Sequence, residues 1–346
     1  MSAHVLAVRL DNDGDVLLAG PAIRAVAAGA ARVTLLCGPR GRAAAELLPG
    51  VDEVVVHRAA WIDPEPEPVE PQALLALVQG LAARRIDEAF VFTSFHQSPL
   101  PTALLLRLAG VPVVAATSED YPGSLLDVRH RIDDDVHEVE RSLSLVATLG
   151  YRLPDEDARK LAVKVDSECD SPAGGEPYVV VHPGASVPAR TWPADRHATL
   201  VDVLVEEGRR VVVTGTAAES ELTALVAGSA RPEVLNLGGR TSFAGLGQVL
   251  RGADAVVVGN TGPAHLAAAM GTPVVSLYAP TVPAVRWRPW RVPHVLLGDQ
   301  DAACAGTRAR VCSVPGHPCL GCVSVEEVLA GVETIAAPRA RVGAAA

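Results

Sequence analysis

The sequence lacks the features of several protein classes. Charged residues or prolines interrupt each apolar segment within about ten residues, well short of the ~20 apolar residues that a membrane-spanning helix needs. The formal net charge is −10 and Lys and Arg form no long cluster, which disfavours binding to nucleic acid. The chain starts directly with the strand-like residues 5–8, without the basic segment or cleavage site of a secretory signal. We therefore expect a cytoplasmic protein, and peripheral attachment to the inner face of the membrane stays open.

Two further absences limit the classes of protein to which the chain can belong. No Gly-x-Gly-x-x-Gly motif follows the first strand predicted in either half of the chain, so an NAD-linked dehydrogenase loses its main support. Only two methionines accompany abundant Ala, Val and Arg, a composition typical of high-GC bacterial coding sequences. With 346 residues, of which 49% are hydrophobic, the chain is a folded protein long enough for about two domains.

Strand and helix patterns alternate along the whole chain, which predicts an α/β protein. Apolar runs indicate strands at residues 4–8, 32–36, 53–56, 89–92, 113–116, 178–181, 210–214, 234–236, 255–258 and 274–277. Helical patterns lie between them, at residues 19–28, 42–48, 73–83, 100–108, 136–149, 195–207, 219–227 and 242–251, and one more covers residues 325–336. Residues 154–177 are polar and broken by Pro and Gly, so the domain boundary is expected inside this segment.

The two sets of strands predict two Rossmann-like domains. We place an N-terminal domain at residues 1–165, a C-terminal domain at residues 176–325, and a C-terminal helix and tail at residues 326–346 that can pack back on the first domain. Parallel sheets covered by helices put the ligand cleft between the domains, at the carboxyl ends of the strands.

Residues 254–278 form the most informative segment and read as strand, loop, helix and strand. Thr261 suits the N-cap of the helix, Pro263 suits its first turn, and Gly262 lets a ligand approach the backbone. The helix N-terminus would then offer free N–H groups and a positive dipole end to a phosphate. The alternative is that these residues merely cap a buried helix.

Three carboxylates follow the first predicted strand, at Asp11, Asp13 and Asp15. Mutual repulsion should raise the pKa of at least one of them toward neutrality, which suits a general base. The same string resembles the start of an EF-hand loop, but Val16 replaces the required glycine and no ligand Glu follows. It also matches the Asp-x-Asp opening of haloacid-dehalogenase phosphatases, although residues 259–261 replace the later acidic metal pair of those enzymes.

Three motifs in order together resemble glycosyltransferase family 9, the ADP-heptose:lipopolysaccharide heptosyltransferases and their relatives. They are Gly14-Asp15, residues 182–186 (His-Pro-Gly-Ala-Ser) with 190–193 (Arg-Thr-Trp-Pro), and residues 260–265 (Asn-Thr-Gly-Pro-Ala-His). The resemblance implies a GT-B fold, in which two Rossmann-like domains face each other across a cleft. The first would bind the acceptor and the second the nucleotide sugar. The resemblance also implies that a sugar, heptose in this family, is transferred with inversion from an ADP-sugar co-substrate. It implies no metal ion and no further cofactor.

The resemblance assigns roles to single residues. Asp15 matches the Asp that takes the proton of the acceptor hydroxyl, so it is chosen as the base over Asp11 and Asp13. Arg190 matches a basic residue that neutralises charge on the leaving ADP. Glu219 matches the acidic residue that accepts hydrogen bonds from the ribose hydroxyls. A solvated surface arginine and a first-turn helix glutamate are the alternatives for the last two.

Three further residues complete the predicted donor site. The Ser186 hydroxyl, with neighbouring loop N–H groups, can bind diphosphate oxygens. His265, one turn into the helix, can donate to a phosphate, with a packing histidine as the alternative. Asn260 stands where the family frequently has Asp, which puts in doubt any role that needs a carboxylate there.

Acceptor-binding residues are expected in loops of the first domain. His96 follows one strand, Arg129 and Arg131 follow the next, and Asp13 joins them, with turn formation or helix capping as its alternative. Such loops suit a polar acceptor, and the arginines suit an anionic one. Because lipopolysaccharide belongs to Gram-negative envelopes, the acceptor can also be another glycan or a small natural product.

Cys304, Cys312, Cys319 and Cys322 cluster near the C-terminus. Their spacing fits no standard zinc finger, although the last two form a metal-style pair. A cytosolic location disfavours stable disulfides. Such segments recur in the family without a catalytic role, so packing is expected and zinc is the alternative.

Two other functions remain open at this point. A GT-B sugar-nucleotide epimerase shares the fold and the phosphate-binding helix. A non-catalytic nucleotide-sugar-binding protein of the same shape belongs to a different class; the retained Asp15 argues against it, and feeble turnover with intact ADP binding would argue for it.

Overall fold

The computed structural model describes residues 3–132, 135–165 and 171–336. The chain divides into two units, Met1–Lys164 and Val165–Ala346. Residues 337–346 of the predicted C-terminal tail lie outside the described residues. Within the described ranges, no helix is both long enough and apolar enough to cross a membrane.

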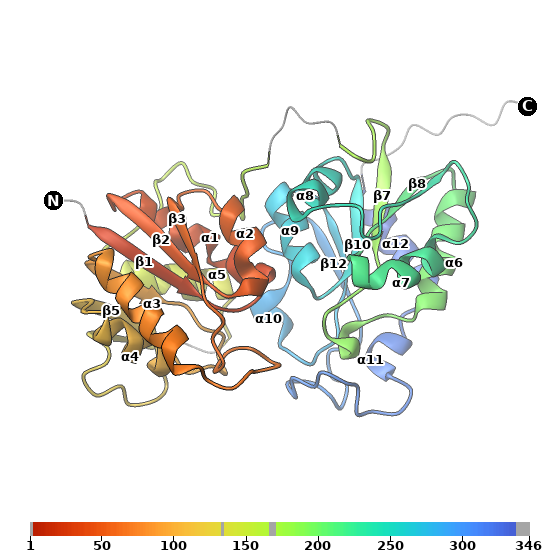
Figure 1. Ribbon diagram of the computed structural model, residues 1–346. Coiled ribbons are helices and arrows are strands. Elements are labelled where there is room, and N and C mark those ends of the chain that lie inside the picture. The colour runs from red at the N-terminus through yellow and green to blue at the C-terminus, as the bar shows by residue number, and fades with distance from the viewer. Residues whose placement is uncertain (1–2, 133–134, 166–170, 337–346) are drawn as a thin grey trace, which may run out of the picture. The chain divides into compact units, whose positions relative to one another are not determined.

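The described residues of the first unit form a six-stranded parallel sheet in the order β3-β2-β1-β4-β5-β6 (Figure 1). Its strands are β1 (His4–Arg9), β2 (Arg32–Cys37), β3 (Glu53–Val56), β4 (Glu88–Val91), β5 (Val113–Thr117) and β6 (Val128–His130). The helices of this unit are α1 (Asp13–Ala27), the 3₁₀ turn η1 (Pro39–Gly41), α2 (Arg42–Leu47), α3 (Pro71–Ala83), α4 (Leu100–Leu108) and α5 (Glu138–Ala147).

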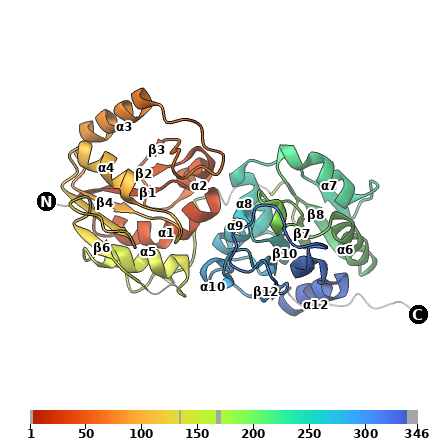
Figure 2. The ribbon, with the colours of Figure 1, turned by 90° about the horizontal axis from the view of Figure 1, so that it is seen from below.

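Helices cover both faces of the first sheet. α1 packs against α2 and α5 on one face, whereas α3 and α4 lie on the other (Figure 2). Leu6 and Val8 of β1 belong to a buried cluster with Leu81 of α3 and Leu106 of α4. The central strands are apolar along their length because both of their faces are covered.

Helix α1 begins at Asp13, whereas the sequence pattern predicted a start at residue 19. Asn12, with extended backbone, takes the N-cap position, and the carboxylates of Asp13 and Asp15 lie in the first turn, where the helix dipole favours them. Pro21, a residue that favours helix starts, is accommodated inside the helix instead. Asp15 therefore lies on a helix and not in a loop, which fixes its position relative to β1.

The described residues of the second unit form another six-stranded parallel sheet, in the order β12-β11-β10-β7-β8-β9. Its strands are β7 (Tyr178–His182), β8 (Arg210–Val213), β9 (Val234–Asn236), β10 (Ala255–Gly259), β11 (Val274–Leu277) and β12 (His294–Leu297). The helices are η2 (Pro188–Arg190), α6 (Ala194–Glu206), η3 (Ala217–Glu219), α7 (Ser220–Ala227), α8 (Phe243–Arg251), α9 (Gly262–Met270), α10 (Ala284–Trp287), α11 (Pro318–Gly321) and α12 (Val325–Ile335).

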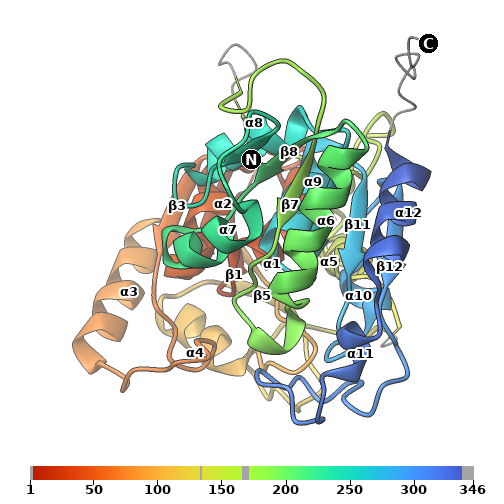
Figure 3. The ribbon, with the colours of Figure 1, turned by 90° about the vertical axis from the view of Figure 1, so that its right-hand side faces the viewer.

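The last helix, α12, belongs to the core of the second unit. It packs on α6 and on strands β10, β11 and β12, and Figure 3 shows it on the same side of the sheet as α6. Val328 and Val332 are buried in one cluster with Val201 of α6 and Val275 of β11. Its apolar face therefore fills the core of the second unit, and the packing of this helix on the N-terminal domain stays a prediction. The position of α12 against α6 corresponds to that of α5 against α1 in the first unit.

Two edge strands, β6 and β12, were missed by the sequence analysis. β6 has three residues, two of which are Arg129 and His130, so it gives no apolar run, whereas the short apolar run of β12 was not assigned to a strand. As a result Arg129, which was expected in a loop, lies in β6.

Both sheets have the same strand order, with one point at which the order reverses. β1 lies between β2 and β4, and β7 lies between β8 and β10. At such a point the connections leave the two central strands toward opposite faces, which opens a crevice at their carboxyl ends. The residues that follow β1 and β4, and those that follow β7 and β10, are therefore placed to bind ligands.

Candidate functional site

In the first unit, the buried side chain of Arg9 joins the polar residues that follow β1 and β4. Arg9 ends β1, and its Nη2 donates to Ser94 Oγ at 2.8 Å and to Asp15 Oδ1 at 3.0 Å. Its Nε lies 2.8 Å from Asp11 Oδ2. One guanidinium thus holds two carboxylates and a residue of the loop after the neighbouring strand in fixed positions, because its nitrogens lie in one rigid plane.

The charges of this Arg9 cluster act on one another. Burial opposes the charge on Arg9, but the carboxylates of Asp11, Asp15 and Glu138 raise the pKa of its guanidinium overall. Burial raises the pKa of Asp11, and the nearby Asp15 carboxylate adds to that rise, although Arg9 opposes it. The predicted rise in pKa within this group of carboxylates is therefore present at Asp11, with desolvation as its largest cause and repulsion as a smaller one.

Asp13 has a partner that the sequence did not indicate. Its Oδ1 accepts a hydrogen bond from the backbone N–H of Ala44 in α2 at 2.9 Å. Burial raises the pKa of this carboxyl to about 6. Ala44 lies in the first turn of α2, so the Asp13 carboxylate caps the N-terminus of that helix, and the capping alternative describes Asp13 in this form. Its assignment to the acceptor remains a prediction.

The loop after β4 reaches the Arg9 cluster through residues other than His96. Ser94 accepts from Arg9, and Gln97 Nε2 donates to Asp11 Oδ1. His96 is exposed and meets Phe95 edge to face, with ring centroids 5.3 Å apart. Ser94 and Gln97 are thus the members of this loop that organise the carboxylates.

The two arginines predicted to bind an anionic acceptor differ in their surroundings. Arg129 Nε donates to the backbone oxygen of Ser118 at 3.1 Å, and its Nη2 donates to the backbone oxygen of Glu119. Arg131 is exposed just after β6. Arg129 therefore holds the loop that follows β5, and this use of its guanidinium reduces what it can offer to an acceptor.

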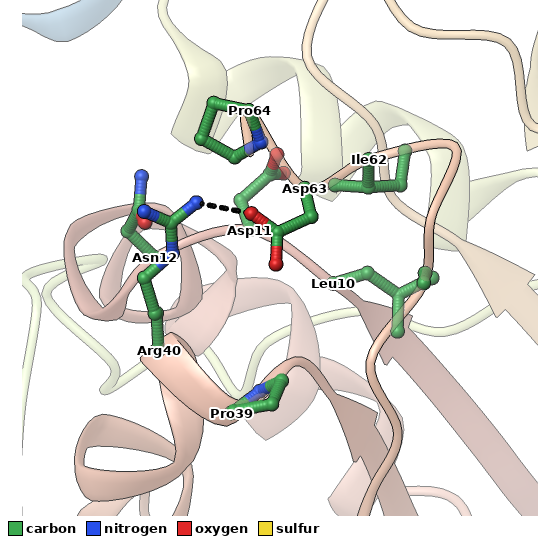
Figure 4. Close-up of a pocket in the computed structure, with 9 residues that line it drawn as sticks. Leu10, Asp11, Asn12, Pro39, Arg40, Ile62, Asp63 and Pro64 are labelled. Carbon is green, nitrogen blue, oxygen red and sulfur yellow. Dashed lines mark hydrogen bonds and ion pairs between the residues drawn. The ribbon is translucent and has the colours of Figure 1, made fainter. Parts of the chain in front are cut away.

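A pocket opens beside the Arg9 cluster, where β1, β2 and β3 end (Figure 4). Its cavity volume is about 30 Å³, which is room for little more than one water molecule. Polar and apolar side chains line it, namely Leu10, Asp11, Asn12, Pro39, Arg40, Ala59, Ile62, Asp63 and Pro64. The sequence analysis assigned no role in binding to this group of residues as a whole.

In the second unit, the N-terminus of α9 follows β10 directly. Thr261 occupies the N-cap position and Pro263 lies in the first turn, as predicted. Among the residues that the structure describes, neither Asn260 Nδ2 nor Thr261 Oγ1 has a hydrogen-bond partner, although both atoms are buried. Unpaired buried polar atoms are costly, so their presence at a helix N-terminus indicates a site for a ligand rich in hydrogen-bond acceptors.

Arg190 lies at the end of the same strand. It closes η2, and its Nη1 is 3.5 Å from the backbone oxygen of Asn260. Gly259 makes this approach possible, because a Cβ there would come within 2.9 Å of the Arg190 backbone oxygen. Ser186 is exposed in the loop that leads from β7 to η2. The backbone geometry thus brings the predicted cation to the α9 N-terminus, while the role of Ser186 remains a prediction.

Glu219 links the loops that follow β7 and β8. Its Oε2 accepts from the backbone N–H and the hydroxyl of Thr216, at 2.8 and 2.9 Å, in a capping box. A Cβ at Gly184 would come within 2.0 Å of Glu219 Oε1, so only a glycine fits against this carboxylate. His265, four residues after the N-cap of α9, is 4% exposed. The capping alternative for Glu219 is thus present, and contact with a ribose stays a prediction.

The cysteine segment contributes to the core of the second unit. Cys304 and Cys319 belong to its buried cluster, whereas Cys312 is half-buried and Cys322 is exposed. Burial, with Cys304 close by, raises the pKa of the Cys319 thiol to about 12. Within the described part of the chain, no group of three or more His, Cys, Asp or Glu side chains is arranged to hold a metal ion.

Arg9 is the main site residue that the sequence analysis missed. The strand predicted there ended at residue 8. Ser94, which binds Arg9, and Gln97, which binds Asp11, lie far away in sequence. The signal that could have found it is a single charged residue that ends an otherwise apolar strand and precedes three carboxylates.

Comparison with known proteins adds a family and a fold. The model of "Glycosyltransferase family 9 (heptosyltransferase)" matches residues 75–317. Lipopolysaccharide heptosyltransferase 3 of Escherichia coli K12 is 32% identical over 162 residues, which are 44% of this chain and 47% of that protein. Lipopolysaccharide heptosyltransferase 1 of Pseudomonas aeruginosa is 33% identical over 225 residues, which are 63% and 61% of the two chains. The aligned regions span about half the length of these curated relatives.

Among solved structures, the chain is similar to the Escherichia coli heptosyltransferase WaaC with ADP-2-deoxy-2-fluoro heptose. The TM-score is 0.71 at 22% identity, over 96% of this chain and 99% of that one. At this identity the likeness bears on the fold alone. It confirms the predicted GT-B fold class, with two Rossmann-like units.

Proposed function

The chain belongs to glycosyltransferase family 9, and we propose that it transfers a sugar from an ADP-sugar donor to a hydroxyl group of an acceptor, with inversion and without a metal ion. Heptose is the proposed sugar, because the relatives are heptosyltransferases and a fluoro-heptose donor linked to ADP is bound by a protein of the same fold. Inversion and independence of metal rest on the family resemblance.

The observation that carries the proposal is the position of Asp15 in the Arg9 cluster. Among the three described carboxylates that contact Arg9, the side chain of Asp15 is 19% exposed, against 9% for Asp11 and 1% for Glu138. A general base must be within hydrogen-bond reach of the proton that it removes. Exposure therefore favours Asp15 as the base by a criterion independent of the resemblance, and Arg9 fixes the direction of its carboxylate.

The proposed donor site is the N-terminus of α9. A diphosphate would supply acceptors for Asn260 Nδ2 and Thr261 Oγ1, and its charge would be stabilised by the helix dipole. Arg190, near the backbone of Asn260, would then stabilise the charge that grows on the leaving ADP. Glu219 would accept hydrogen bonds from the ribose, and Ser186 and His265 would complete the donor contacts.

The experiment that tests this function combines titration and turnover. Calorimetric titration with ADP, UDP and GDP should give the tightest binding for ADP, and incubation with ADP-heptose and a panel of acceptors should release ADP. An epimerase would convert the nucleotide sugar without releasing ADP. A non-catalytic binding protein would bind ADP and leave the donor intact. Either of these results contradicts the proposed transfer.

A further inference from the structure

His182 is a buried histidine at the carboxyl end of β7. It is 5% exposed, and its Nδ1 lies 2.9 Å from the hydroxyl oxygen of Thr214, the residue that follows β8. Among the described residues, the other ring nitrogen, Nε2, has no hydrogen-bond partner, and it keeps contact with solvent. Nε2 is therefore the part of the ring that a ligand can reach.

The hydroxyl of Thr214 determines which ring nitrogen carries the proton. Thr214 is fully buried, and within the described part of the chain its hydroxyl meets only the His182 ring. A buried hydroxyl hydrogen needs an acceptor, so Thr214 donates and Nδ1 accepts. Burial lowers the pKa of His182 to about 4, although the Glu219 carboxylate opposes this, so the ring is neutral at pH 7. A neutral ring that accepts at Nδ1 presents an N–H donor at Nε2.

The sheet places this donor between the two parts of the proposed nucleotide site. His182 pairs in register with Val258 of β10, two residues before Asn260 at the start of α9. On its other side, β8 leads to Glu219, which is close enough to affect the pKa of His182. A nucleotide with its diphosphate at α9 and its ribose at Glu219 would have the phosphate that joins them, the α-phosphate, beside the end of β7.

Resting on the proposed function, we infer that the Nε2–H of His182 donates a hydrogen bond to the α-phosphate of the ADP-sugar donor. The bond that breaks in the transfer joins the sugar to the β-phosphate, so the charge on the α-phosphate is the same before and after the reaction. The contact is therefore equally strong in the ground state and the transition state. Its loss should raise KM and the dissociation constant of ADP and leave kcat nearly unchanged.

Two substitutions at His182 test this contact in the full chain. The amide nitrogen of a glutamine can reach the place of Nε2, whereas the shorter asparagine reaches only the place of Nδ1. His182→Asn can still accept from Thr214 but offers no donor to the phosphate, so the dissociation constant of ADP should rise about tenfold. His182→Gln should stay within about threefold of the unmodified chain. Calorimetric titration with AMP should give the same rise in His182→Asn, because AMP and ADP share the α-phosphate.

His197→Phe is the matched control. His197 is a second buried histidine near His182, but it lies in α6 against Trp192 and not at the end of a strand. Both nucleotides should bind this variant as they bind the unmodified chain.

Thr214→Val and Thr214→Ser form a second pair, which decides the question if His182→Asn does not fold. Valine leaves Nδ1 without a donor and lets the ring proton move to that nitrogen, so ADP and AMP should bind about threefold more weakly. Serine keeps the hydroxyl and should keep the affinity.

The outcomes separate this inference from the proposed function. Absence of ADP binding in the unmodified chain contradicts the function itself. Intact ADP binding with unchanged affinity in His182→Asn, or with equal weakening in His182→Asn and His182→Gln, overturns the inference and leaves the function standing. Equal affinities of Thr214→Val and Thr214→Ser for ADP also overturn it. Weakening for ADP but not for AMP would move the contact to the β-phosphate and overturn the assignment to the α-phosphate.

Discussion

Arg9 and Asp15, six positions apart in the chain, meet at the point where β1 passes into α1: Arg9 Nη2 donates to Asp15 Oδ1 at 3.0 Å. The arginine is 2% exposed and the aspartate 19%, so the pair consists of a buried anchor and an accessible carboxylate. The same guanidinium contacts Asp11, which lines the neighbouring pocket. Arg9 thereby connects the proposed base with a carboxylate at the edge of this pocket.

Arg9 is expected to position the base. A lysine keeps the charge but cannot hold Asp11 and Asp15 with separate nitrogens of a rigid plane. Arg9→Lys should therefore lower kcat by about tenfold to a hundredfold through loss of orientation. The dissociation constant of ADP should not change, because the proposed donor site belongs to the other unit.

Removing the positive charge of Arg9 should lower the stability of the folded chain. Arg9→Met leaves buried carboxylates without their cation and should lower the free energy of unfolding by about 3–5 kcal/mol. Denaturant unfolding of Arg9→Lys and Arg9→Met checks this expected difference in stability.

For the positioning role, equal kcat for Arg9→Lys and the unmodified chain would show that Arg9 does not orient Asp15.

Gly262, the first residue of α9, is predicted to face the diphosphate. A valine there would occupy the space next to the helix N-terminus that the phosphate needs. Gly262→Val should abolish ADP binding in a calorimetric titration. Gly245→Val is the control, since Gly245 lies in the first turn of the neighbouring helix α8, where an added Cβ meets nothing closer than 3.4 Å. Unchanged ADP affinity in Gly262→Val would place the nucleotide elsewhere.

Arg190 should affect chemistry more than donor binding. A cation that pairs most strongly with charge developing on the leaving group contributes mainly in the transition state. Arg190→Ala is therefore expected to lower kcat by roughly 10²–10³ and to weaken ADP-heptose binding by less than about tenfold. Donor titration and initial rates on the same preparation measure both effects. The opposite pattern, weak binding with kcat preserved, would make Arg190 an ordinary donor contact.

His197 of α6 should make stability depend on pH. It is 1% exposed beside Trp192, with ring centroids 4.9 Å apart, and burial lowers its pKa to about 3. Because the unfolded chain takes up a proton near pH 6.5 and the folded chain does not, unfolding is favoured as the pH falls below 6.5. This group alone should cost about 1.4 kcal/mol per pH unit between pH 6 and 4.

His197→Phe keeps a ring beside Trp192 but cannot titrate. The difference in unfolding free energy between the two chains should therefore change with pH below 6.5 and stay constant above it. Urea unfolding at several pH values checks this. A constant difference between pH 4 and 8 would mean that His197 takes up its proton with the same pKa in the folded and the unfolded chain.

The sequence was sufficient where local chemistry decides the structure. The strand, N-cap and helix around Thr261 follow from an apolar run, a capping residue, Pro263 and a glycine, all within a short segment, and the structure has them. It was insufficient for β6, because a three-residue strand that contains Arg129 and His130 gives no apolar run, and it left the short apolar run of β12 unassigned. It also placed the start of α1 too late and so put Asp15 in a loop.

Contacts between distant segments account for the rest of the candidate site. Ser94 lies 85 positions from Arg9, and Asp13 binds a backbone N–H 31 positions away, so neither contact leaves a local pattern. The acidic residues near Asp63 form no local motif that would mark a pocket. Only the fold shows that Asp63 and Arg40 line a pocket beside Asp11.

The central claim is that Asp15 removes the proton of the acceptor hydroxyl. The most direct test is to measure ADP affinity and turnover of ADP-heptose in Asp15→Asn, a substitution that keeps the shape of the side chain. The account predicts a loss of about 10²–10⁴ in turnover with nearly unchanged ADP affinity, because removal of a general base acts on the transition state and not on the donor site. A loss of less than about tenfold, with the protein folded and ADP bound, would show that another group takes the proton and would contradict the account.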